Sequence, residues 1–232
     1  MFELTPSGGG YRESIIHSFG SGTDGESPQS GVVLDTAGNV YGTTDGGGTG
    51  AVGTVYQLVP SHGGWVENVL VNFDVTNGDG PYGNLIIDAS GNLYGVTEGG
   101  GQSGYGVVYQ LTPSGGGFTY SVLYSFSSLC QSDGGLAMDT AGDFFGVCYG
   151  GGGASQDGWI FELTNCSQGC SVVDLHDFSG SDGTQPFGSP VLDAHGNLYG
   201  TTYTGGTGGS GCYFIGCGVV WEIAGVGARH KD

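Results

Sequence analysis

The stretch that decides the fold is Asp193-Ala-His-Gly-Asn197-Leu-Tyr-Gly200, because the chain repeats it. The other copies are Asp35-Thr-Ala-Gly-Asn39-Val-Tyr-Gly42, Asp88-Ala-Ser-Gly-Asn92-Leu-Tyr-Gly95 and Asp139-Thr-Ala-Gly-Asp143-Phe-Phe-Gly146. The leading aspartates are 53, 51 and 54 residues apart. A fixed period near 50 residues is typical of solenoids, propellers and arrays.

Each period contains four short apolar runs. In the second copy they are residues 84–87, 93–97, 107–112 and 118–126, rich in Val, Ile, Tyr and Phe and bounded by Gly, Pro, Asp and Asn. Such runs are typical of strands, and four strands in about 50 residues make one propeller blade. In the Asp-x-x-Gly-Asn segment, Gly supplies a positive φ and Asp can accept bonds from backbone N–H groups, which predicts a tight hairpin turn.

The sequence therefore predicts an all-β propeller of about four four-stranded blades in a single domain over residues 1–224. Full repeats cover about 31–73, 83–126 and 135–178, and the last repeat, about 188–224, lacks its fourth strand. Residues 2–19 form a partial repeat, and residues 225–232 are expected to be a flexible tail. We expect the N-terminal strand, 11–19, to complete the last blade and close the ring. Because residues 2–5 and 219–223 both resemble the third strand of that blade, an open or self-associating arc is the alternative.

The charge of the chain excludes some classes of binding partner. The 232 residues carry a net charge of −19, and Arg12, Arg229 and Lys231 are the only Lys or Arg residues. This argues against nucleic acid and anionic membrane surfaces, both of which select clustered Lys and Arg. No apolar run is long enough to span a membrane. The chain opens inside a repeat, so we expect a fragment or a trimmed chain whose export signal is missing.

Six cysteines fall into three close pairs. They are Cys130 with Cys148, Cys166 with Cys170, and Cys212 with Cys217. We expect three local disulfides and an oxidising compartment. A metal site is the alternative, but a second Cys-x-x-Cys and a nearby His pair are lacking.

The recurring Asp-x-x-Gly-Asn-Leu-Tyr-Gly-Thr-Thr, Val-Tyr-Gln-Leu-Thr-Pro and Val-Leu-Tyr-Ser-Phe segments resemble the GloVer tandem-repeat family of exported bacterial proteins. The first two strands of each repeat are also similar to NHL-type propeller repeats. The resemblance implies export and surface anchoring through variable C-terminal sorting signals, and it supplies no catalytic residues. The third copy departs from the motif, with Asp143-Phe-Phe in place of Asn-Leu-Tyr.

Strand alternation places two sets of loops on one face, the loops between repeats and the glycine-rich loops after the second strand of each repeat. The first set contains a repeated Asp-Gly dipeptide, at Asp24, Asp79, Asp133 and Asp182. These carboxylates could ring the central axis and hold Ca²⁺, although no cofactor is required. The alternative, which we favour, is that each Asp caps its own turn.

The glycine-rich loops vary most between repeats, and variable loops on a constant scaffold commonly carry function. Their aromatic residues are Tyr105, Tyr149, Tyr203, Tyr213 and Phe214. The flat apolar faces of these side chains would suit sugar rings, although loop packing explains them equally well.

These patterns favour a non-catalytic extracellular or cell-surface protein that binds a glycan or another surface ligand through its loop face. One alternative is a polysaccharide-acting propeller enzyme. Its acidic residues would break the repeat symmetry, as Asp157, Asp174 and Asp177 do in the third repeat. Another alternative is a structural unit that self-associates through its terminal strands.

Overall fold

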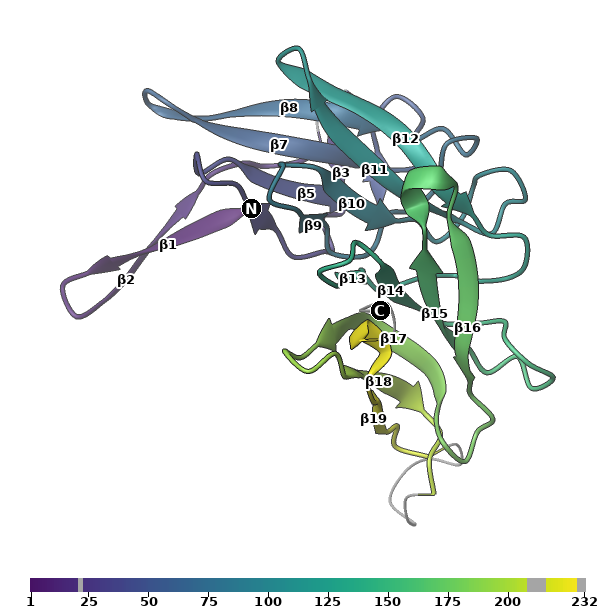
Figure 1. Cartoon of the computed structure of the whole chain (residues 1–232). Helices are drawn as coiled ribbons and strands as arrows, with labels where there is room; N and C mark the ends of the chain where they lie inside the picture. The colour runs from purple at the N-terminus through teal and green to yellow at the C-terminus, as the bar shows by residue number, and fades with distance from the viewer. Residues whose placement is uncertain (21–22, 208–215, 229–232) are drawn as a thin grey trace.

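Four small antiparallel sheets follow one another along the chain as the blades of a propeller (Figure 1). The computed structural model describes residues 1–20, 23–207 and 216–228. Within these residues the regular elements are strands and two short 3₁₀ turns, and no helix is long and apolar enough to cross a membrane. The predicted all-β propeller of four blades is confirmed.

The blades keep the strand order of the repeats. The first comprises β4 (Val33–Leu34), β5 (Val40–Thr44), β7 (Thr54–Ser61) and β8 (Gly64–Asn72). The second comprises β9 (Ile86–Ile87), β10 (Leu93–Val96), β11 (Val107–Ser114) and β12 (Gly117–Ser125). The third comprises β13 (Ala137–Met138), β14 (Phe144–Cys148), β15 (Trp159–Thr164) and β16 (Ser171–Asp177). The fourth has three strands, β17 (Thr184–Leu192), β18 (Leu198–Thr204) and β19 (Val220–Ile223).

The repeated aspartate organises the turn between the first two strands of a blade. Asp88 Oδ1 accepts the backbone N–H groups of Ser90 and Asn92 at 2.8 and 2.9 Å. Its Oδ2 accepts the Asn92 amide at 2.7 Å and the Tyr94 hydroxyl at 3.0 Å. The third repeat has Asp143 and Phe145 at these two positions, and its Asp139 Oδ1 accepts the backbone N–H groups of Ala141 and Asp143.

The aspartate of this turn makes the stability of the protein depend on pH. Burial opposes the shift, but bonds from Asn92, Tyr94 and the turn backbone hold the pKa of Asp88 below its usual range. A backbone bond from Asn197 is the main cause that lowers the pKa of Asp193 to about 2. Because the folded pKa lies below the unfolded one, this stabilisation is complete above about pH 4 and is lost as the pH falls through the folded value.

We therefore expect Asp88→Asn to lower the free energy of unfolding by about 1 kcal/mol at pH 7. Because the substitution removes the carboxylate that titrates, the difference between the two proteins should shrink towards pH 2. Urea denaturation at several pH values measures both quantities. A difference that grows as the pH falls would contradict this role for the turn aspartate.

A glycine beneath an aromatic ring explains the end of the repeated motif. In each blade, the last motif glycine pairs across the ladder with the aromatic residue of the third strand; the pairs are Gly42–Tyr56, Gly95–Tyr109, Gly146–Phe161 and Gly200–Trp221. A Cβ on any of these glycines would lie inside contact distance of the ring. The rings of the first three blades are buried, so the glycine is required for core packing.

Neighbouring blades meet through polar and glycine contacts near the innermost strands. The N–H of Gly31 donates to Asn84 Oδ1 at 2.6 Å, joining the first blade to the second. The N–H of Gly135 donates to Ser189 Oγ at 3.0 Å, joining the third blade to the fourth. These hydrogen bonds link blades that follow one another in the sequence.

The N-terminal strands do not confirm the expected ring closure. β1 (Phe2–Ser7) and β2 (Gly10–Ile15) pair with each other as a separate hairpin, which projects from the blades in Figure 1. Gly8 and Gly9 both have positive φ, at 57° and 89°, as two-residue hairpin turns favour. Because the short turn pairs β2 with β1, β2 does not join the fourth blade. In the described residues the sheet of the fourth blade therefore has three strands.

Part of the predicted flexible tail packs against the fourth blade. Residues 226–228 form a 3₁₀ turn, and Val226 is fully buried against Phe178 and Leu198. The N–H of Gly227 also donates to the Gly196 carbonyl at 3.1 Å. One apolar side chain with a core site is enough to dock this segment, whereas residues 229–232 lie outside the described part.

Two of the three expected disulfides lie in the described residues. Cys130 bonds to Cys148 and Cys166 to Cys170. Cys217 is also disulfide-bonded, and Cys212, its expected partner, lies outside the described residues. Disulfides are compatible with an extracellular protein.

Candidate functional site on the loop face

Carboxylates from the first three repeats gather on the loop face. Burial raises the pKa of Glu98, and the charges of Asp133, Asp45 and Asp79 raise it further. Burial also raises the pKa of Tyr82 to about 12, together with a hydrogen bond to Asp45 and charges from Glu98 and Asp133. We call Asp45, Asp79, Glu98 and Asp133 the acidic cluster.

The four repeated aspartates do not share one environment. Asp79 and Asp133 belong to the acidic cluster, and burial raises the pKa of each. Asp24 instead contacts His17, and Asp182 contacts His176. The structure therefore does not bring the four aspartates together in one ring, and calcium binding by Asp24, Asp79, Asp133 and Asp182 stays a prediction.

Removing one charge from the acidic cluster should stabilise the protein. The raised pKa of Glu98 means that its ionised form is disfavoured by folding, so this cost appears as the pH rises through the folded pKa. We expect Glu98→Gln to raise the melting temperature by about 2 °C in chelator at pH 7.

Added Ca²⁺ gives the control for that prediction. If the cluster binds Ca²⁺, the wild type should gain melting temperature with calcium and the variant should gain less. Equal gains in both proteins would argue against calcium at this cluster, and a less stable variant in chelator would contradict the repulsion.

A pocket of about 530 Å³ lies between the loops of the third and fourth blades. Its lining combines one aromatic ring with polar side chains: Tyr149, Gln131, Gln156, Gln185, Asp157, Thr184 and Thr204, with Leu129 and three glycines. Planar amides, hydroxyls and a carboxylate around a ring face can bind a polar molecule that also has an apolar surface. We call this the loop-face pocket.

Three glutamines of the loop-face pocket have unusual backbones. Gln131, Gln156 and Gln185 have φ values of 44°, 60° and 58°. Few residues other than glycine adopt this region, yet Ser27 and Ala51 of the first repeat also do so, with φ values of 57° and 59°. The second blade has Gly80 where the third has Gln131, since the N–H groups of Glu98 and Tyr149 donate to their respective carbonyls. The first blade has Ser27 there, whose carbonyl accepts the Asp45 N–H and whose φ is 57°. The left-handed backbone is therefore a feature of the repeat, and the glutamine side chain is what distinguishes the third blade at this position.

The five predicted aromatic residues do not gather at one place. Tyr149 lines the loop-face pocket, and Tyr105 lies in the corresponding loop of the second blade. Tyr203 belongs to β18 and not to a loop, and it is 69% exposed. Tyr213 and Phe214 lie outside the described residues.

A larger cavity, of about 810 Å³, opens on the opposite face between the second and third blades. It is lined by the turn residues of those blades, including Asp88, Asp139 and Asp143. Asp88 is already occupied by the hydrogen bonds of its own turn. We therefore interpret this cavity as the gap between two structural turns.

Comparison with known proteins identifies the repeat. The family model described as the Gloeobacter/Verrucomicrobia repeat matches residues 1–214, most of the chain. The chain belongs to the Gloeobacter/Verrucomicrobia repeat family. No curated protein matches it in sequence.

Solved structures align with the chain at low identity. A protein provisionally described as a gluconolactonase aligns with 75% of the chain at 16% identity and a TM-score of 0.50. A luciferin-regenerating enzyme aligns with 85% at 16% identity and a TM-score of 0.46, and a Dyadobacter fermentans protein of unknown function with 82% at 14% and 0.49. The chain covers 57%, 61% and 59% of these three proteins, so they are considerably longer.

Within this Gloeobacter/Verrucomicrobia repeat chain, the acidic departures of the third repeat occupy two places. Asp157 lines the loop-face pocket. Burial raises the pKa of Asp174, and the neighbouring Asp177 raises it further by its charge and a hydrogen bond. The third repeat therefore contains one pocket carboxylate and one close carboxylate pair.

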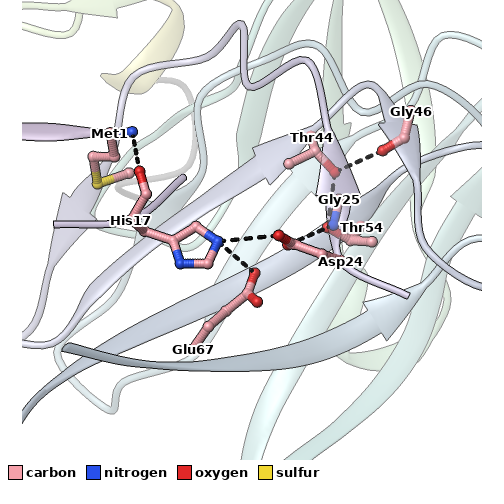
Figure 2. Close-up of polar contacts among 8 residues, drawn as sticks. All are labelled: Met1, His17, Asp24, Gly25, Thr44, Gly46, Thr54 and Glu67. Carbon is pink, nitrogen blue, oxygen red and sulfur yellow. Dashed lines mark hydrogen bonds and ion pairs between the residues drawn. The ribbon is translucent and has the colours of Figure 1, made fainter. Parts of the chain in front are cut away.

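A second polar group lies beside the first blade and joins His17, Asp24 and Glu67 (Figure 2). Burial, together with a hydrogen bond to Asp24 and the charge of Asp24, raises the pKa of Glu67 to about 7. Sequence reasoning missed Glu67. Comparison of the strands in register reveals it, because Tyr120 and Val172 occupy the ladder position of Glu67 in the second and third blades.

Proposed function

We propose that this chain is a non-catalytic binding module, exported or displayed at the cell surface, which binds a saccharide in the loop-face pocket. The observation that carries the proposal is the lining of this pocket, where Tyr149 lies among the side chains of three glutamines. Saccharides present apolar ring faces and many hydroxyl groups, so they match an aromatic ring surrounded by amides and hydroxyls.

Several pocket side chains are already held in place. The Gln156 amide donates to the carbonyls of Gly152 and Gly153, both at 2.8 Å. The Thr204 hydroxyl donates to Gln185 Oε1 at 3.2 Å. Side chains fixed before binding lose less conformational entropy when a ligand arrives, which favours affinity.

The loop-face pocket favours binding over hydrolysis. Most glycoside hydrolases place two carboxyl groups on either side of the bond that they cleave. Among the described lining residues of this pocket, Asp157 is the one carboxylate. It would act as a hydrogen-bond acceptor for sugar hydroxyls.

The location of the protein is part of the proposal. Two described disulfides support an oxidising compartment, and membership of a bacterial repeat family agrees with export.

The enzymatic alternative is favoured by the Asp174–Asp177 pair. Two adjacent carboxylates can share a proton, and the raised pKa of Asp174 agrees with this. Hydrolysis or elimination of a polysaccharide by the wild type, abolished by Asp177→Asn, would support an enzyme.

The structural alternative is favoured by the N-terminal hairpin. Its exposed apolar side chains are Phe2, Leu4, Tyr11 and Ile15. A solution mass that rises with concentration, and that returns to the monomer value in the Leu4→Ser variant, would support self-association.

A glycan array tests the saccharide proposal, with the wild type assayed once in calcium and once in chelator. We expect binding by the wild type, loss of binding in Tyr149→Ala, and retention in Tyr105→Ala, a matched tyrosine of the second blade outside the pocket. A wild-type array without signal in both buffers would refute saccharide binding. Equal signals from both variants would refute this pocket as the site.

A further inference from the structure

We propose that His17, Asp24 and Glu67 form a binding site for a divalent transition-metal ion, Zn²⁺ in particular, that fastens the N-terminal segment to the first blade. The site goes beyond the proposed saccharide binding and does not depend on it. Its ligands come from three separate segments: His17 follows β2, Asp24 precedes β3 (Gly25–Glu26), and Glu67 lies in β8. Figure 2 shows their polar atoms pointing toward one another.

The geometry suits a small ion. His17 Nε2 lies 3.2 Å from Asp24 Oδ2 and 3.7 Å from Glu67 Oε1, and the three ligand atoms are all within 4.8 Å of one another. Ligands of tetrahedral zinc lie about 2.0–2.1 Å from the metal, which places them about 3.4 Å apart. Both histidine distances are close to that value, and a small rotation of the carboxylates would bring the third pair into range.

Burial and charge leave the site in need of a cation. The side chains of Asp24 and Glu67 are 7% and 16% exposed. The Asp24 and Glu67 carboxyl groups contact each other, and Glu67 Oε1 is buried with no donor within hydrogen-bond distance. The ion pairs of both groups in the described residues run to His17. One imidazolium balances one carboxylate at most. Buried charges are normally paired or coordinate metals, so a divalent ion would satisfy the second carboxylate and Glu67 Oε1 together.

The mixed ligand set decides which metal fits. Calcium and magnesium select oxygen ligands, whereas an imidazole nitrogen with carboxylates suits zinc and its neighbours in the transition series. Three protein ligands leave a fourth tetrahedral position for water. The His17 ring is oriented by an edge-on contact with Phe19, at a centroid distance of 4.4 Å.

The third repeat supplies a natural control. His176 Nε2 lies 2.9 Å from Asp182 Oδ2, and its ring packs edge-on against Phe178, as His17 does against Phe19. Here, however, Val172 occupies the ladder position of Glu67, and the two side chains are 40% and 39% exposed. The pair repeats the histidine and aspartate without the third ligand, so it should bind zinc weakly.

The test uses tag-free full-length protein, dialysed against chelator and titrated with zinc alone by calorimetry. We expect one strongly bound Zn²⁺ per chain, with affinity weakened by more than the roughly 10–100-fold loss typical of an outer-shell partner in both His17→Gln and Glu67→Gln. His176→Gln should bind as the wild type does. Circular dichroism of each variant confirms folding.

Cobalt gives a second readout that a structural effect would not produce. Co²⁺ should show visible absorption of a tetrahedral nitrogen and oxygen site in the wild type and His176→Gln, and this band should be absent in Glu67→Gln. Unchanged zinc affinity in both site variants, loss of binding in His176→Gln, or no zinc binding by the wild type would each overturn the proposal.

Discussion

Gly95→Val is expected to lower the free energy of unfolding by about 3 kcal/mol, because the new side chain must occupy space filled by Tyr109 and Leu85. Tyr109 is fully buried and Leu85 is 1% exposed, so neither can move into solvent without loss of core packing. Chemical denaturation of the two proteins measures the difference.

The matched control is Gly117→Val. Gly117 begins β12 on the exposed edge of the same blade, and a Cβ there would meet one backbone oxygen at 3.9 Å. We expect this change to stay within about 0.5 kcal/mol of the wild type. If Gly95→Val were as stable as Gly117→Val, the close approach of glycine and ring would not be what the motif preserves.

Replacement of Cys130 and Cys148 by alanine is expected to cost about 3 kcal/mol of stability, because the bond closes a segment with a sequence separation of 18. Both cysteines are fully buried in the core shared by the second and third blades. Alanine leaves no polar group behind, so the loss reports the crosslink and the lost sulfur contacts.

The Cys166–Cys170 bond provides the comparison for this prediction. It spans a sequence separation of only 4 at the rim of the third blade, so its removal should cost about 2 kcal/mol. Thermal melts of both double variants, under oxidising conditions, test the order. A larger loss from Cys166→Ala/Cys170→Ala would contradict the account based on loop closure.

The sequence predicted the turns and strands that are formed by residues close together in the chain. The Asp88 turn needs an acceptor, a positive-φ glycine and a side-chain donor within five residues, so the sequence displays all three together. The expected strands 93–97, 107–112 and 118–126 lie close to the observed β10, β11 and β12 for the same reason.

Contacts between distant segments were harder to predict. The Asp-Gly dipeptides begin five, six, seven and four residues after a phenylalanine near the end of the preceding strand, so they do not share one height in all four loops. These phenylalanines are Phe19, Phe73, Phe126 and Phe178. Asp79 and Asp133 consequently reach the acidic cluster, whereas Asp24 and Asp182 reach histidines. A repeated dipeptide indicates a common position only when the loop length is constant.

The candidate sites depend on residues that break the repeat rather than on those that keep it. Glu67 replaces an apolar or aromatic residue in a half-buried ladder position, and Gln131 stands where the first two blades have Ser27 and Gly80. Both changes could be found only after the strands had been placed in register, because their meaning comes from the equivalent residue in the next blade.

We propose that this propeller binds its saccharide in the loop-face pocket. The most direct measurement is the ¹H–¹⁵N spectrum of the labelled protein with and without the oligosaccharide that binds best on the array. We predict that shifts concentrate at Tyr149, Gln131, Gln156 and Gln185, which line the pocket. Shifts confined to the opposite-face cavity around Asp139, or an unchanged spectrum at saturating sugar, would contradict it.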